Sequence, residues 1–80
     1  MKFTKVVGTE IRKAKLDDGT IYALIGQVKE LLEKNIIFPD NTSGNEEKWL
    51  GIENNGDNFK EFNTLQDAKN YYRSIFVIKN

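Results

Sequence analysis

The side chains that could carry out acid–base catalysis are limited to carboxylates, lysines and three tyrosines, because the 80 residues include no Cys and no His. That excludes thiol catalysis, Cys- or His-ligated metals and the Ser-His-Asp triad. The adjacent pairs Asp17-Asp18 and Glu46-Glu47 lie in predicted loops, where carboxylates are usually hydrated. Ser43 and Ser74 have no candidate base. We therefore predict a protein that is not an enzyme and that uses no cofactor and no metal.

The charges balance overall, twelve basic against twelve acidic, but they are unevenly distributed. Residues 1–15 hold five basic side chains and one acidic, residues 16–67 hold four and eleven, and residues 68–80 hold three basic and none acidic. Two interpretations stand. The charges form an ordinary hydrated surface, or the two ends of the chain meet and form one basic patch.

Turn signals and alternating hydrophobicity predict three strands in the first part of the chain, over residues 3–7, 10–16 and 20–25. Asp18-Gly19 predicts a two-residue hairpin loop. The predicted partners are Leu16 with Ile21, Lys15 with Tyr22, Ala14 with Ala23, Lys13 with Leu24, and Arg12 with Ile25. Lys13, Lys15 and Tyr22 would then share the outer face of the hairpin.

A helix over residues 20–35 is an alternative, because its apolar residues also fit helical spacing. We favour a strand over 20–25, a break at Gly26 and a helix over 27–35 that ends at Asn35. Residues 36–38 should be extended before Pro39, and residues 39–47 should form a mobile surface loop.

The second part of the chain predicts a strand over 48–53, a turn at Asn55-Gly56, a strand over 58–62 and a helix capped by Thr64. The turn would set Ile52 opposite Phe59 and Trp49 opposite Phe62, on opposite faces. The helix has an apolar stripe of Leu65, Ala68, Tyr72, Ile75 and Phe76.

These elements predict one α+β domain over residues 1–80, with an antiparallel sheet of four to five strands and two helices in the order β-β-β-α-β-β-α. The predicted core residues are Val6, Leu16, Ile21, Val28, Leu31, Leu32, Ile52, Leu65, Ala68, Tyr72 and Ile75.

We expect a non-catalytic binding module that recognises another protein, such as an accessory or inhibitor protein of a phage or mobile element. Aromatic and acidic side chains are the candidate protein-binding residues: Trp49, Phe62, Glu46, Glu47 and Asp57. The alternative is a small nucleic-acid-binding module that uses the basic ends, with Lys13, Lys15, Tyr22 and Arg73 as candidates. No secretory signal or membrane-length apolar run is present, which predicts a cytoplasmic protein without membrane contact.

Overall fold

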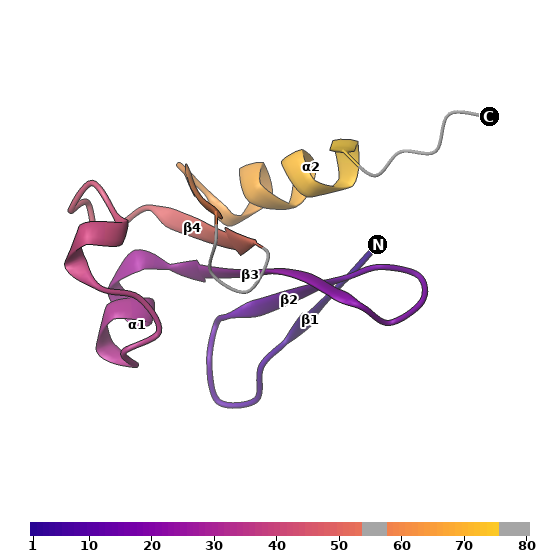
Figure 1. The fold of residues 1–80 in the computed structure, drawn as a ribbon, viewed down its shortest axis with the longest axis horizontal. Helices are drawn as coiled ribbons and strands as arrows, with labels where there is room; N and C mark the ends of the chain where they lie inside the picture. Colours follow the sequence, from indigo (N-terminus) through magenta and orange to yellow (C-terminus); the bar gives the residue numbers. More distant parts are fainter. Residues whose placement is uncertain (54–57, 76–80) are drawn as a thin grey trace.

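The computed structural model describes residues 1–53 and 58–75, which form a five-stranded antiparallel sheet with two helices (Figure 1). The strands follow one another in space in chain order and are β1 (Lys2–Lys5), β2 (Arg12–Lys15), β3 (Ile21–Gln27), β4 (Trp49–Glu53) and β5 (Asn58–Phe62). Helix α1 (Val28–Glu33) follows β3, and α2 (Leu65–Ile75) follows β5. The predicted α+β class and element order are confirmed.

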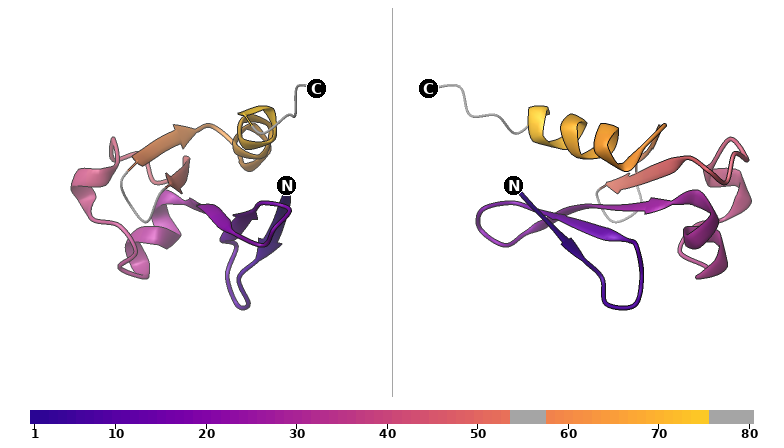
Figure 2. Two further views of the ribbon diagram at one scale, coloured as in Figure 1. Left: turned by 45° about the vertical axis from the view of Figure 1, so that its right-hand side comes forward. Right: turned by 180° about the vertical axis from the view of Figure 1, so that it is seen from behind.

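The sheet carries a hydrophobic cluster on each face, with α2 on one side and α1 on the other (Figure 2). Successive side chains of a strand point to opposite faces. The cluster under α2 consists of Ala14, Ala23, Ile25, Phe62, Ala68 and Tyr72. The cluster under α1 consists of Ile11, Val28, Leu31, Ile37, Leu50 and Ile52. Several of these, such as Ile11, Ile37 and Leu50, were not predicted as core residues.

The hairpin of β4 and β5 has the predicted register. Trp49 lies opposite Phe62 and Ile52 lies opposite Phe59. The two pairs face opposite sides, since Trp49 packs with the α2 cluster and Ile52 belongs to the α1 cluster. The predicted Asn55-Gly56 turn lies outside the described residues.

The predicted pairing of β2 with β3 is correct at one end and wrong at the other. Arg12 lies opposite Ile25 and Ala14 opposite Ala23, as predicted, but Lys15 lies opposite Ile21 rather than Tyr22. Leu16 does not pair with Ile21, because its N–H donates to the carbonyl of Thr20 at 2.8 Å. The hairpin loop therefore has three residues and ends at Gly19, whose φ is 92°.

This longer loop adds one residue to β3 and creates a bulge. Tyr22 is the extra residue of the bulge, and its ring packs under α2, 6.0 Å from the ring of Tyr72. Tyr22 therefore does not share the outer face with Lys13 and Lys15, contrary to the prediction. Ile21 is 48% exposed and is not a core residue either.

The alternative helix over residues 20–35 is wrong, and the chain passes directly from β3 into α1. Gly26 is not a break but the penultimate residue of the strand. A Cβ at this position would lie 2.8 Å from Cδ2 of Leu31, so the glycine allows α1 to fold back closely. Helix α1 ends at Glu33, two residues before the predicted end. Asn35 follows it in the left-handed conformation, with a φ of 59°, and the N–H of Ile36 donates to the carbonyl of Leu31 at 2.9 Å.

Helix α2 begins as predicted, because Oγ1 of Thr64 accepts a hydrogen bond from the N–H of Asp67 at 3.0 Å. Ala68 and Tyr72 are buried, whereas Ile75 is exposed, contrary to the predicted core. Phe76, the last residue of the predicted apolar stripe, lies outside the described residues. Of the other predicted core residues, Val6, Leu16, Leu32 and Leu65 are only half-buried.

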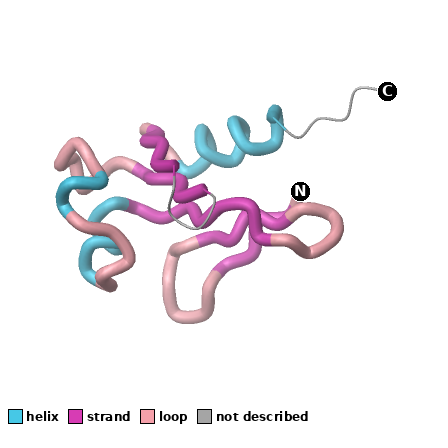
Figure 3. The backbone as a smooth tube through the Cα atoms, viewed as in Figure 1, coloured by secondary structure: helices cyan, strands magenta, loops and turns pink. Residues whose placement is uncertain are grey.

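The segment after α1 contains a further short helical turn (Figure 3), and its side chains and backbone contact the sheet. Ile37 is buried in the α1 cluster, and Pro39–Asn41 forms a short 3₁₀ helix in place of the predicted structureless loop. Glu61 on β5 holds the following residues: its carboxylate accepts hydrogen bonds from Oγ1 of Thr42 at 2.8 Å and from the N–H of Ser43 at 2.9 Å. We call this contact the Glu61 latch.

Glu61→Gln is expected to lower the free energy of unfolding by about 1 kcal/mol at pH 7, because a charged acceptor of two hydrogen bonds is lost. The N–H of Ser43 and the hydroxyl of Thr42 lower the pKa of Glu61. The latch should therefore be fully formed above the unfolded-state pKa of about 4.5 and weaken as the pH falls through the lower folded-state value.

Urea unfolding at pH 7 and at pH 3 measures this contribution. Glu47→Gln is the matched control, because Glu47 is exposed and should change stability little. Equal losses in the two variants would show that the latch does not contribute.

Candidate binding surfaces

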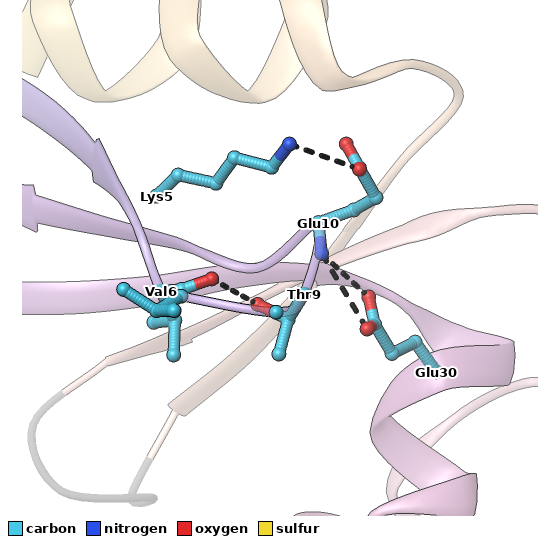
Figure 4. Close-up of a pocket in the computed structure, with 7 residues that line it drawn as sticks. Lys5, Val6, Thr9, Glu10 and Glu30 are labelled. Atoms are coloured by element: carbon cyan, nitrogen blue, oxygen red, sulfur yellow. Dashed lines mark hydrogen bonds and ion pairs between the residues drawn. The ribbon is translucent and has the colours of Figure 1, made fainter.

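An open depression of about 510 Å³ lies between the β1–β2 turn and α1 (Figure 4). Its charged groups already bind one another. Nζ of Lys5 lies 3.1 Å from the carboxylate of Glu10, and the N–H of Glu10 donates to Oε1 of Glu30 at 3.2 Å. The hydrogen bond and charge of Lys5 lower the pKa of Glu10. The carboxylates of Glu10 and Glu30 and the ammonium of Lys5 are thus engaged in contacts within the depression itself.

The predicted aromatic pair does not form an exposed surface. Phe62 is 8% exposed, and its ring centroid lies 5.5 Å from that of Tyr71 and 5.8 Å from that of Tyr72. Trp49 is half-buried against the same cluster. Phe62 is therefore part of the core, while Trp49 packs against the same cluster and stays partly accessible.

The described part of the structure contains two of the three predicted acidic residues. Glu46 and Glu47 are exposed, and their backbone carbonyls accept hydrogen bonds from the N–H of Lys29 and from Nε2 of Gln27. Glu53, an acidic residue that was not among these candidates, is buried. Asp57 lies outside the described residues. Glu46 and Glu47 are therefore the candidates that the described structure leaves accessible.

The exposed aromatic side chain at this end of the molecule is Phe38, which is 69% exposed. Sequence reasoning missed it, because residues 36–38 resemble a short buried strand. Its neighbour Ile37 is buried, while Ile36 is exposed. The N–H of Phe38 donates to Oδ1 of Asn41 at 2.8 Å. We call residues 36–47 the Phe38 loop.

Three of the five basic residues at the start of the chain point to the face of the sheet away from α2, while Lys5 and Arg12 point to the other face and pair with Glu10. Lys2 lies directly opposite Lys15, and Thr4 lies opposite Lys13. Phe3 and Ala14, the residues between them, pack with the α2 cluster, so the three lysines point to the other face. None of the three forms a salt bridge within residues 1–53 and 58–75.

The basic residues of α2 approach β1 from its other face. The guanidinium of Arg73 lies 5.1 Å from the ring centroid of Phe3, and Nζ of Lys69 lies 5.9 Å from it. Figure 1 likewise shows the N-terminus beside the last turn of α2. Two of the basic residues of the C-terminal part, Lys69 and Arg73, therefore lie beside the first strand. We call the cations that flank β1 the basic edge: Lys2, Lys13, Lys15, Lys69 and Arg73.

Comparison with known proteins returns no match: no family model fits the chain, and no curated protein or solved structure is significantly similar to it. Within the part of the chain that the structure describes, no helix is long and apolar enough to cross a membrane. The same residues contain no group of three or more Asp or Glu side chains placed to hold a metal ion. The candidates for function are therefore the Phe38 loop and the basic edge.

Proposed function

We propose that this protein is a non-catalytic binding module that recognises another protein through the Phe38 loop. The observation that carries the proposal is an exposed Phe38 on a backbone held at several points. Ile37 anchors the loop in the core, Asn41 binds the backbone of Phe38, and the Glu61 latch holds Thr42 and Ser43.

A loop held in this way loses little conformational freedom when it binds, so more of the contact energy contributes to affinity. Aromatic side chains are enriched in protein interfaces, and a few buried anchors supply most of the binding energy. We therefore expect the partner to offer an apolar pocket for Phe38. An accessory or inhibitor protein of a phage or mobile element would act in this way.

The acidic charge near the Phe38 loop indicates which charge the partner should carry around that pocket. Residues 33–47 contain Glu33, Asp40, Glu46 and Glu47 but only Lys34 as a basic residue. A basic rim around the pocket would complement this excess of acidic charge. Such complementarity acts mainly on the rate of association.

The partner can be captured with a photo-crosslinking side chain at Ile36, and the same group at Val7 is the control. Val7 is 96% exposed but lies on the β1–β2 turn. With the captured protein purified, Phe38→Ala is expected to weaken binding at least about tenfold, and Val7→Ala is expected to leave it unchanged. Unchanged binding by Phe38→Ala, with the fold intact, would remove Phe38 as the anchor.

The double variant Glu46→Lys/Glu47→Lys is expected to associate with the same partner several times more slowly at low salt and with little difference at high salt. Stopped-flow mixing across a salt series measures the rate. Asp17→Lys/Asp67→Lys is the control, because it changes the net charge equally at two exposed sites outside the Phe38 loop. A wild-type rate for the first variant at low salt would mean that the partner does not approach this acidic surface.

A further inference from the structure

We propose that the basic edge binds the phosphate backbone of a nucleic acid duplex, a second function that is separate from the Phe38 loop. The basic edge flanks β1 beside the N-terminus, and the Phe38 loop lies at the other end of the long axis of the molecule (Figure 1). The proposal rests on the arrangement of the cations on both faces of β1.

The first argument is that Lys2, Lys13 and Lys15 repel one another in the absence of a ligand. Lys2 and Lys15 are direct cross-strand partners. Like charges in such a pair are about 5 Å apart at Cβ and repel one another. Lys13 is two residues from Lys15 on the same strand, about 7 Å away, and adds to the repulsion. A phosphate backbone would replace this repulsion by attraction, and neighbouring phosphates along one strand have a similar spacing.

The acidic residues nearest in sequence do not neutralise these lysines. Asp17 and Asp18 belong to the adjacent β2–β3 turn. Oδ1 of Asp17 lies 3.5 Å from the amino group of Met1, and Oδ1 of Asp18 accepts a hydrogen bond from the N–H of Thr20 at 2.9 Å. Both carboxylates are engaged elsewhere, which leaves the lysines available to an external anion.

The second argument is the position of Arg73 and Lys69 on the opposite face of the same strand. Their contacts with the ring of Phe3 fix the two cations over β1. Strand β1 is an edge of the sheet, so no further strand separates the cations of the two faces. An extended anion that lies along this edge can therefore contact cations from both faces.

The third argument favours a duplex over a single strand. Proteins that bind single strands stack bases on exposed aromatic rings. The two aromatic rings nearest this edge are already used, since Phe3 is covered by Lys69 and Arg73 and Tyr22 packs against Tyr72. Backbone contacts remain, and a duplex offers about one negative charge per 1.7 Å of its axis.

Fluorescence anisotropy with a short labelled duplex and with one of its strands tests the proposal over a salt series. We expect the wild-type protein to bind the duplex more tightly than the strand and to lose affinity steeply with salt. Lys13→Gln/Lys15→Gln should bind the duplex at least about tenfold more weakly, with the slope of log K against log salt reduced by about two. Lys29→Gln/Lys34→Gln, which makes the same charge change on and after α1, should bind like the wild type.

Several outcomes would overturn the proposal. The first is absence of duplex binding at the lowest salt. The second is an equal loss of duplex affinity in the two double variants. The third is tighter binding to the single strand, to polyglutamate or to anionic lipid vesicles than to the duplex. Thermal melting of both variants checks their folding. Backbone amide shifts on adding the duplex provide a second readout, and they should be largest in β1 and β2; shifts confined to α1 and the Phe38 loop would also contradict the assignment.

Discussion

Gly51→Ala is expected to destabilise the protein by about 3 kcal/mol or more, because α2 lies directly on the backbone of β4. A Cβ at residue 51 would lie 2.1 Å from the hydroxyl oxygen of Tyr72 and 2.9 Å from its Cζ. Tyr72 is fully buried and cannot move aside cheaply. Burial and the nearby Glu53 carboxylate also raise the pKa of Tyr72, so its hydroxyl stays neutral at ordinary pH.

Urea unfolding measures this loss, and a second substitution tests its cause. Tyr72→Phe removes the hydroxyl that the new methyl group would meet, so it should recover part of the stability in the Gly51→Ala background. Gly26→Ala is the control, because its Cβ would come no closer than 2.8 Å to another atom, Cδ2 of Leu31, and its cost should be smaller. If Gly51→Ala were no costlier than Gly26→Ala, the close approach of α2 would be wrong.

Ile25→Ala is expected to cost about 3–4 kcal/mol, whereas Ile21→Ala on the same strand should cost less than about 1 kcal/mol. Ile25 is completely buried under α2, and Ile21 is 48% exposed. Both residues would share the buried face if β3 had no bulge, since they are four positions apart. The difference between the two variants therefore measures the effect of the bulge.

Chemical denaturation of both variants at one temperature gives the comparison. Ile36→Ala provides a reference for a partly exposed isoleucine outside the sheet, and its cost should match that of Ile21→Ala. Equal losses at Ile25 and Ile21 would indicate the regular two-residue hairpin loop, with Ile21 packed in the core.

The sequence was sufficient where neighbouring residues determine the structure. The hairpin of β4 and β5 has the predicted register, because alternation and the position of the turn restrict its pairing. The start of α2 follows from the hydroxyl of Thr64, and the end of α1 follows from the left-handed conformation of Asn35. Each of these features depends on backbone chemistry within a few residues.

The candidate binding surfaces were less predictable, because they depend on residues far apart in the chain. Because the β2–β3 loop has one residue more than predicted, the side chain of Tyr22 lies on the α2 side of the sheet and not on the side of Lys13 and Lys15. Phe62 is buried because α2 packs over it. Phe38 is exposed on a loop that is held by Ile37 and the Glu61 latch, which are contacts that no local pattern indicates.

Sequence alone determined that positive charge is concentrated at the two ends of the chain, and it left open whether those ends meet. In the tertiary structure α2 packs on β3, β4 and β5, and the side chains of Arg73 and Lys69 reach from it to the ring of Phe3 on β1. The physical reason is that burial of the apolar stripe of α2 against the sheet sets its position. Because Lys69 and Arg73 lie outside this stripe, the same packing places them near the edge strand β1.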